Sequence, residues 1–204
     1  MTTKTLNISE EQLVDYSKAH NEPSWMTELR KKALKLTETL EMPKPDKTKL
    51  RKWDFDTFKQ HHTTGDSYHQ LTDLPKSVKE IIDVENSENL IIQHNNDLAY
   101  TQVSDQAKND GVIIEGLSEA LVNHSDLVQK YFMTKAVNVD EHRLTALHTA
   151  LVNGGIFVYV PKNTVVEHPI QYVVLHDDEQ ASFYNHVIIV TEESAEVTLS
   201  LIHI

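Results

Sequence analysis

The stretch LHTALVNGGIFVYVPKNTVVEHPIQ, residues 147–171, marks the place where the character of the chain changes. Up to it, apolar residues recur at the spacing of an amphipathic helix, which we expect over residues 140–153. We expect Gly154 and Gly155 to end that helix, because glycine accepts the left-handed conformation of a helix cap. Beyond the glycine pair the pattern is that of strands, so this stretch divides a helical part from a β part.

The residues after the glycine pair alternate between short apolar runs and tight breaks. Short strands joined by tight corners, with no helix between them, are typical of a β-sandwich or a β-solenoid. Periodicity does not choose between the two, and no clear internal repeat decides the matter. We expect strands over residues 156–160, 165–167, 170–175 and 182–190, and from residue 195 onward.

Toward the N-terminus, the sequence predicts two amphipathic helices. Ser9 and Gln12 have the spacing of a capping box at the start of the first helix. The second helix follows Pro23, which a first turn tolerates, and ends before Pro43. We expect Arg30 and its polar neighbours on the outer side of this helix. The predicted apolar stripe consists of Trp25, Met26, Leu29, Ala33, Leu36 and Leu40.

The middle of the chain mixes both kinds of pattern. Residues 52–58, KWDFDTF, alternate aromatic and polar side chains at first and predict a half-buried strand. Residues 95–97, NND, are typical of a hairpin turn. We further expect a short helix over residues 75–83, strands over 89–94, 98–103 and 111–115, and helical structure over 117–132.

The composition excludes several classes of protein. The chain has 204 residues with 31 acidic and 19 basic side chains, and its net charge of −12 disfavours nonspecific binding to nucleic acid. It has no cysteine, so these residues form no disulfide and no Cys-ligated metal or iron–sulfur site. No apolar run approaches the roughly 20 residues that span a bilayer, and we find no secretory signal pattern. We therefore expect a cytoplasmic protein without membrane or nucleic-acid partners.

One local run departs from the acidic average. Residues 44–52, KPDKTKLRK, are strongly basic. We interpret them as a solvated linker, with a docking surface for an acidic partner as the alternative.

The 12 histidines are the first candidates for a metal site. His61, His62 and His69 lie in a polar, loop-like stretch, where adjacent side chains of an extended chain point to opposite faces. His142 and His148 are too far apart on one helix for the paired spacing of a zinc helix. We favour a structural or surface role for all five.

A second histidine group lies on the predicted strands. His168, His176 and His186, with Glu167, are candidates to converge on a metal ion, although the compact cupin spacing is missing. Surface histidines on strands are the simpler interpretation. The sequence also contains no P-loop, no dinucleotide-binding glycine pattern, no nucleophile elbow and no visible carboxylate pair. It therefore assigns no catalytic, cofactor-binding or metal-ligating residue.

Two segments carry a specific resemblance to a known family, and a third stretch continues the match. They are NEPSWMTELR at residues 21–30, continuing to MPKP at 42–45; the stretch at 147–171 quoted above; and FYNHVIIV at 183–190. Together they resemble the SufB/SufD family of iron–sulfur cluster assembly scaffolds, and the SufD branch more than the SufB branch. The second segment is the most specific of the three.

The resemblance implies an α+β fold, in which a helical N-terminal region is followed by the first rungs of a right-handed parallel β-helix (β-solenoid). It divides the chain into a helical segment and linker at residues 1–50, a mixed α/β region at 51–153 and the start of the β-helix core at 154–198. It implies a scaffold subunit of a SufBCD complex and not an enzyme. The implied partners are a SufB-like subunit and a SufC-like ABC ATPase, with a nascent iron–sulfur cluster at the level of the complex and no cofactor in this chain. The family's residues for cluster assembly and ATPase docking lie further toward its C-terminus, so the chain resembles an N-terminal fragment.

Two other functions stay open at this point. A metal-dependent enzyme on a β-scaffold would use His168, His176 and His186. A sugar-processing β-helix would need paired carboxylates in a cleft, and the sequence shows none.

The last six residues, LSLIHI at 199–204, have a separate interpretation. They continue a strand pattern, but the same string is encoded by CTG-TCT-CTT-ATA-CAC-ATC, the mosaic end of transposase-based sequencing libraries. We expect the authentic sequence to end near Thr198 and the remainder to be translated adaptor, so that His203 has no functional meaning.

Resequencing tests this expectation. Amplification of the locus from source DNA, with primers on both sides, should give a reading frame that departs from LSLIHI after about residue 198. A genomic frame that encodes LSLIHI followed by a stop codon would show that the expectation is wrong.

Overall fold

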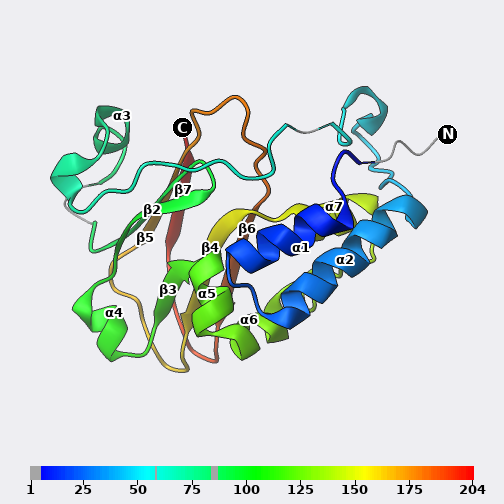
Figure 1. Ribbon diagram of the computed structural model, residues 1–204. Helices are drawn as coiled ribbons and strands as arrows, with labels where there is room; N and C mark the ends of the chain where they lie inside the picture. Colours follow the sequence, from blue (N-terminus) through cyan, green and yellow to red (C-terminus); the bar gives the residue numbers. More distant parts are fainter. Residues whose placement is uncertain (1–5, 58, 84–86) are drawn as a thin grey trace. The chain divides into compact units, whose positions relative to one another are not determined.

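The structure, a computed structural model, describes residues 6–57, 59–83 and 87–204 (Figure 1). The fold is mixed α+β, with helices first in the sequence and most strands after them, as expected. The chain forms two compact units. The helical unit consists of Met1–His61 and Leu121–Val152, and the sheet unit of His62–Ala120 and Asn153–Ile204. None of the helices in the described ranges is long and apolar enough to cross a membrane.

Helices α1 and α2 begin where the sequence predicted. The Ser9 hydroxyl accepts a hydrogen bond from the Gln12 backbone N–H (3.2 Å), and the Gln12 side chain accepts one from the Ser9 N–H (2.8 Å), so the capping box is confirmed. Pro23 is the N-cap residue of α2. The helices of this unit are α1 (Glu10–Ala19), α2 (Ser24–Thr39), η1 (Leu50–Lys52), α6 (Ser125–Tyr131) and α7 (Arg143–Leu151), with the end of α5 (Leu117–Asn123).

The buried line along α2 differs from the expected apolar stripe. Met26 and Ala33 are fully buried, but so are Arg30 and Thr37, which lie between and beyond them. Leu29 and Leu36 are only half-buried. The expectation that Arg30 lies on the outer side is therefore wrong. A buried arginine requires polar partners inside the protein.

The predicted strand at residues 52–58 is also wrong. Lys52 ends η1, and the Asp54 carboxylate accepts hydrogen bonds from the backbone N–H groups of Asp56 (3.0 Å) and Thr57 (3.2 Å). This local Asx turn takes the backbone donors that a strand would offer to a neighbour. Phe58, the last residue of the predicted strand, lies outside the described residues.

The sheet unit contains two sheets, with strand orders β2-β1-β5-β7 and β3-β4-β6. The hairpin predicted around residues 95–97 is confirmed, because β1 and β2 pair antiparallel. All other pairings are parallel except that of β3 with β4. The strands are β1 (Asn89–His94), β2 (Asp97–Gln102), β3 (Ile113–Gly116), β4 (Gly154–Val160), β5 (Ile170–Leu175), β6 (Asn185–Thr191) and β7 (Leu199–His203). The short helical elements are η2 (Leu71–Asp73), α3 (Lys76–Lys79) and α4 (Asp105–Asn109).

Successive strands from β4 onward alternate between the two sheets. Strand β4 pairs with β6 in parallel register, with Gly154 opposite Asn185. Strand β5 pairs with β7 in the same way, with Ile170 opposite Leu199. The segment expected as a strand at residues 165–167 contributes a single parallel bridge, from Val165 to Glu196.

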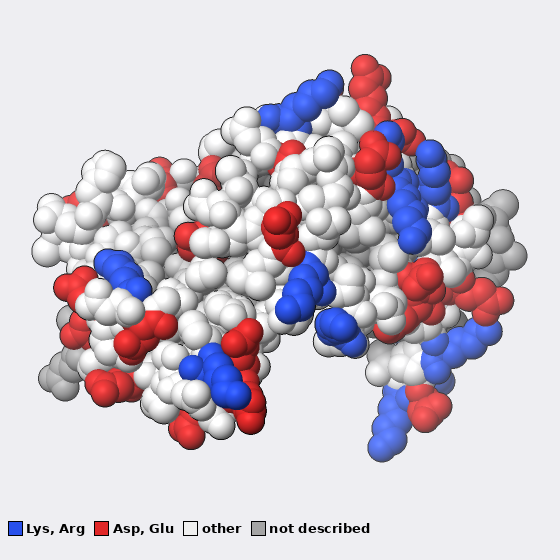
Figure 2. Space-filling view, turned by 90° about the horizontal axis from the view of Figure 1, so that it is seen from below, with Lys and Arg blue, Asp and Glu red and all other residues white. Residues whose placement is uncertain are grey.

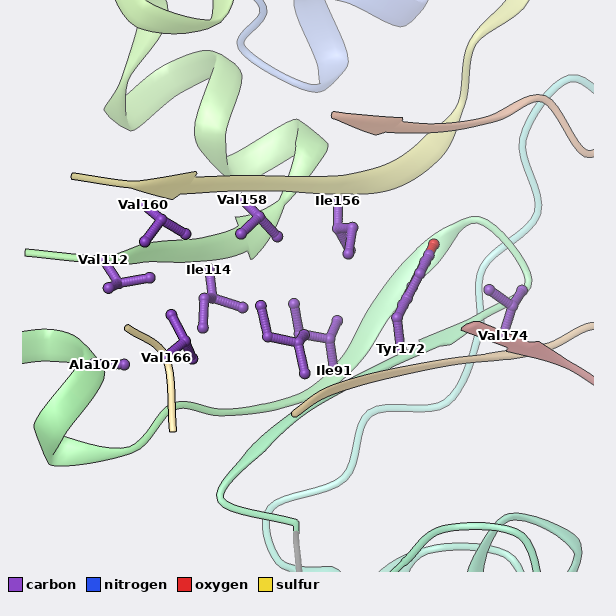
Figure 3. Packing of buried hydrophobic residues seen from close by; sticks show 11 residues of the cluster. Ile91, Ala107, Val112, Ile114, Ile156, Val158, Val160, Val166, Tyr172 and Val174 are labelled. Carbon is purple, nitrogen blue, oxygen red and sulfur yellow. The ribbon is translucent and has the colours of Figure 1, made fainter. Parts of the chain in front are cut away.

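The core of the sheet unit lies between the two sheets (Figure 3). Ile156, Val158 and Val160 alternate along β4 and face Ile91 of β1 and Tyr172 of β5. A second cluster covers the other face of the four-stranded sheet, so β1 and β5 are buried on both faces, as parallel strands usually are. The second cluster contains Leu74, Val78, Ile82, Leu90, Ile92, Ala99, Val173 and Leu175.

Two further expectations need correction. The helical stretch at residues 117–132 is two helices, α5 and α6, which are separated at His124. The glycine pair does not cap a helix: α7 ends with Val152 as its C-cap residue, in an extended conformation, and Gly154 opens β4. Both glycines lie in the sheet unit, at the start of β4.

Candidate functional site

The structure does not bring the strand histidines together. His168 precedes β5 and His176 follows it. Because an extended strand rises about 3.3 Å per residue, these two side chains are roughly 20 Å or more apart. His186 lies on β6, in the other sheet, and the His176 ring packs against Phe183 with 5.5 Å between ring centroids. In the part of the chain that the structure describes, no group of three or more His, Asp or Glu side chains has the arrangement of a metal site.

The loop histidines bind separate partners. The Nε2 atom of His61 lies 2.9 Å from the Leu151 carbonyl oxygen, and its ring packs against Tyr16. The Nε2 atom of His62 lies 3.2 Å from an Asp97 carboxylate oxygen. His69 is exposed. His61 and His62 therefore contact different partners, as expected for adjacent residues of an extended chain.

The two α7 histidines have structural roles. His142 is the N-cap residue of α7, and its Nδ1 atom accepts a hydrogen bond from the Thr145 N–H (3.1 Å). His148 lies near the C-terminal end of α7. Burial, together with the positive charge of Arg30, lowers the pKa of His148, so this side chain is held neutral.

The most concentrated polar cluster lies at the carboxyl end of β1, and the sequence analysis missed it. Gln93, His94, Asn95 and Asn96 are all at most 6% exposed. A β-bulge between Ile92 and Gln93 shifts the register of β1 against β2 just before the cluster. We call these four residues the β1-end cluster.

Gln93 joins strands of both sheets. Its side-chain oxygen accepts hydrogen bonds from the Gly155 N–H (3.0 Å) on β4 and from the Tyr172 hydroxyl (2.5 Å) on β5. The Tyr172 hydroxyl also lies 2.9 Å from the Asn185 side-chain oxygen on β6. Burial raises the pKa of Tyr172 far above its ordinary value, so the hydroxyl stays protonated and remains a donor.

The glycine pair exists because of this close packing. A Cβ atom at Gly154 would collide with the Gln93 side chain, and one at Gly155 would collide with the backbone of His186 on β6. Gly155 also has a φ of +129°, a conformation that other residues avoid. Glycine at both positions lets β4 approach β1 and β6 closely.

His94 fastens two loops to the end of β1. Its Nδ1 atom accepts a hydrogen bond from the Asp66 N–H (2.9 Å), so the proton lies on Nε2, which donates to the Asp177 carboxylate (2.9 Å). The hydrogen bond from His94 is the main cause that lowers the pKa of Asp177. Both ring nitrogens are therefore occupied by partners within the protein, and the imidazole holds structure in place.

The asparagines continue this pattern. The Asn96 amide donates to the Ser182 carbonyl (3.2 Å), and its oxygen accepts from the Thr63 N–H (2.9 Å). Asn153 donates to the same Ser182 carbonyl (2.7 Å). Buried amides of this kind satisfy backbone groups that the strands and turns leave unpaired.

In the helical unit, Arg30 joins α2 to α7. Its guanidinium binds the Glu22 carboxylate with two hydrogen bonds, of 2.8 and 2.6 Å, and both side chains are almost completely buried. The remaining donors reach the carbonyls of Ala150 (2.9 Å) and Val152 (2.8 Å) at the C-terminal end of α7. Carbonyls at a helix C-terminus lack partners within the helix and carry partial negative charge, so a cation there is stabilising.

The charge of Glu22 depends on this pair. Burial alone would raise the pKa of Glu22, but the charge of Arg30 and its hydrogen bonds outweigh burial, and the pKa lies below its ordinary value. The carboxylate is therefore ionised in the folded protein at neutral pH.

Arg143 makes the reciprocal connection from α7 to the C-terminal end of α2. Its Nε atom donates to the Thr37 carbonyl (2.9 Å), and its backbone N–H donates to the Glu41 carbonyl (2.9 Å). Its guanidinium also forms an ion pair with Asp56. Each of the two helices thus contributes an arginine that satisfies carbonyls at the end of the other.

The buried side chains of Gln93, Asn96, Arg30 and Arg143 bind backbone groups of neighbouring segments, so they hold each unit together. Residues 9–172 match a family model described as SufBD protein N-terminal region. The chain belongs to the SufBD family. The motif residues Glu22 and Arg30, and the glycine pair, therefore have structural roles in this family member.

Curated relatives agree with this assignment. The chain is 46% identical to the iron–sulfur cluster assembly protein SufD of Bacillus subtilis over 95% of its own length and 44% of that protein. It is 30% identical to an iron–sulfur cluster assembly SufBD family protein of Pyrococcus horikoshii, over 95% of this chain and 45% of the relative. A Staphylococcus epidermidis family member is 26% identical over 93% of the chain and 42% of the relative. The chain is thus a SufD homologue that spans less than half the length of these relatives.

Proposed function

We propose that the chain acts as a SufD-like scaffold subunit of a SufBCD iron–sulfur cluster assembly complex. The observation that carries the proposal is the 46% identity to the B. subtilis protein named SufD across nearly the whole chain. On this proposal the nascent cluster is cargo of the complex, and this chain holds no cofactor of its own. Its work is to present surfaces to partners and not to carry out a reaction.

We propose further that β4 to β6 belong to the first rungs of a right-handed parallel β-helix. Support comes from the alternation of these strands between two sheets and from the parallel register of β4 with β6 and of β1 with β5. Parallel crossovers are almost always right-handed, which supports the hand. The outer edges of β5 and β6 would receive the next rung.

The partners in this proposal are a SufB-like subunit and a SufC-like ABC ATPase, and the location is the cytoplasm. The family membership supports these partners, since the names of the relatives state iron–sulfur cluster assembly. We also propose the division into residues 1–50, 51–153 and 154–198 as a description of how the whole protein is organised.

A deletion experiment tests the function. Loss of the gene for the parent protein should lower the activity of several iron–sulfur enzymes, because their clusters would no longer be assembled. Activities of aconitase and succinate dehydrogenase should fall together, while an enzyme without a cluster should be unchanged. Unchanged cluster-enzyme activity, in a strain that also lacks any second assembly system, would refute the proposal.

A further inference from the structure

The segment at residues 44–55 presents the most exposed large apolar side chain of the described residues. Trp53 is 63% exposed. Its ring stacks on Phe55, with 5.9 Å between centroids and 16° between planes. Phe55 is half-buried, whereas the Trp53 ring leaves a large apolar surface in water, which costs free energy unless another group covers it.

The segment is held in place on both sides of the indole. Before it, the Trp53 N–H donates to the Leu50 carbonyl (2.9 Å) and closes η1. After it, the Asx turn of Asp54 and the ion pair of Asp56 with the buried Arg143 fasten the chain to α7. The indole is therefore presented by an ordered loop, which reduces the entropy that binding would cost.

A basic run precedes the same ring in the sequence. Residues 44–52 contain five basic residues and one acidic residue. The side chains of Lys47, Lys49 and Lys52 are exposed, and no ion pair of theirs is found within residues 6–57, 59–83 and 87–204. Figure 2 shows one face of the molecule, on which Lys and Arg side chains project next to Asp and Glu side chains.

The two units differ sharply in charge. The helical unit has 15 basic and 13 acidic residues, whereas the sheet unit has 4 basic and 18 acidic residues. The basic run at residues 44–52 carries five basic residues and one acidic residue in a chain whose net charge is −12.

We propose that residues 44–55 form a docking surface for an acidic protein segment that inserts an apolar group against Trp53. Tryptophan is among the residue types enriched as energetic anchors of protein interfaces, and the exposed lysines that precede Trp53 would steer an acidic partner into place. This proposal goes beyond the proposed function and does not depend on it.

A protein partner fits better than a nucleic acid or a membrane. Screening limits charge interactions to about 8–10 Å in physiological salt, so a compact acidic segment interacts with the basic run alone. A nucleic acid or an anionic membrane extends much further than the basic run, and the net charge of −12 of the whole chain repels both.

Fluorescence anisotropy with labelled probes tests the surface on the whole chain. The probe is a short peptide that alternates Asp and Glu with Leu and Phe. Control probes are the same peptide with Ser in place of the apolar residues, an oligouridylate, and phosphatidylcholine vesicles that contain phosphatidylglycerol. We expect the acidic–apolar peptide to bind most tightly, and added salt to weaken its binding.

Two variants identify the surface. The first variant, Trp53→Ala, should weaken peptide binding roughly tenfold or more. The second should weaken it by a similar factor and combines Lys47→Glu, Lys49→Glu and Lys52→Glu. The matched control replaces three lysines of the sheet unit with glutamate, Lys76→Glu, Lys79→Glu and Lys108→Glu, so its net charge changes by the same amount. It should weaken binding far less, and circular dichroism should show all variants folded.

Three results would overturn the proposal. They are absence of peptide binding, equal binding by the Trp53→Ala variant, and tighter binding of the oligouridylate or the vesicles through the same residues. Equal weakening by the control lysines would show a general charge effect and would also overturn it.

Discussion

Replacing Arg30 with methionine is expected to lower the free energy of unfolding by about 3–5 kcal/mol at neutral pH. The change leaves the ionised Glu22 carboxylate buried without its partner and removes the donors from the Ala150 and Val152 carbonyls. Urea unfolding, followed by circular dichroism, measures the loss. A cost below about 1 kcal/mol would show that Arg30 does not join α2 to α7 as described.

The pH dependence gives this prediction a second readout. In the wild-type chain the pKa of Glu22 is lowered, so its contribution to stability is present above the unfolded pKa and is lost as the pH falls through the folded pKa. In Arg30→Met the buried carboxylate has no partner, its pKa should be raised, and acid should reduce the difference between variant and wild type.

A double variant separates the pair from its surroundings. Glu22→Gln combined with Arg30→Met removes both charges, so it should cost less than the sum of the two single changes. Strict additivity would contradict direct coupling between these side chains.

Replacing Gly155 with alanine is expected to cost about 3 kcal/mol or more. The added Cβ atom would collide with the His186 backbone, and φ of +129° is a conformation open almost only to glycine. The collision would also separate β4 from β6 and disturb the hydrogen bond from Gly155 to Gln93. Urea unfolding gives the size of the effect.

Gly111 offers the matched control. It also has a positive φ, of +74°, but the nearest atom to an added Cβ is 3.7 Å away. Gly111→Ala should therefore cost only about 1–2 kcal/mol, from backbone strain alone. If the two variants lose the same stability, close packing of β4 against β6 is not the reason for glycine at position 155.

Local signals made much of the secondary structure predictable. The capping box of Ser9 and Gln12 and the hairpin turn at residues 95–97 each involve neighbours in sequence. Their energetics are decided within a few residues, so the sequence alone is sufficient. The strand at residues 52–58 failed for the related reason that an Asp54 side chain competes locally for the backbone.

Features that depend on distant partners were not predictable in this way. Arg30 has the helical spacing that places it on the same face of α2 as Met26 and Ala33, but a charged residue is expected to be exposed, and only the α7 carbonyls and Glu22 explain its burial. The glycine pair has the pattern of a helix cap until the Gln93 side chain and β6 are in place. The β1-end cluster gave one usable signal, a run of five polar residues, the four of the cluster and Asp97, directly after the apolar residues 90–92.

The central claim, that this chain is part of a SufD-like subunit, is tested most directly by purification of the full-length parent protein from its own cells. With an affinity tag on the chromosomal copy, we expect a SufB-like subunit and a SufC-like ABC ATPase to co-purify in fixed ratio and to remain together through size-exclusion chromatography. Elution of the tagged protein without either subunit, under conditions where both are expressed, would contradict the account.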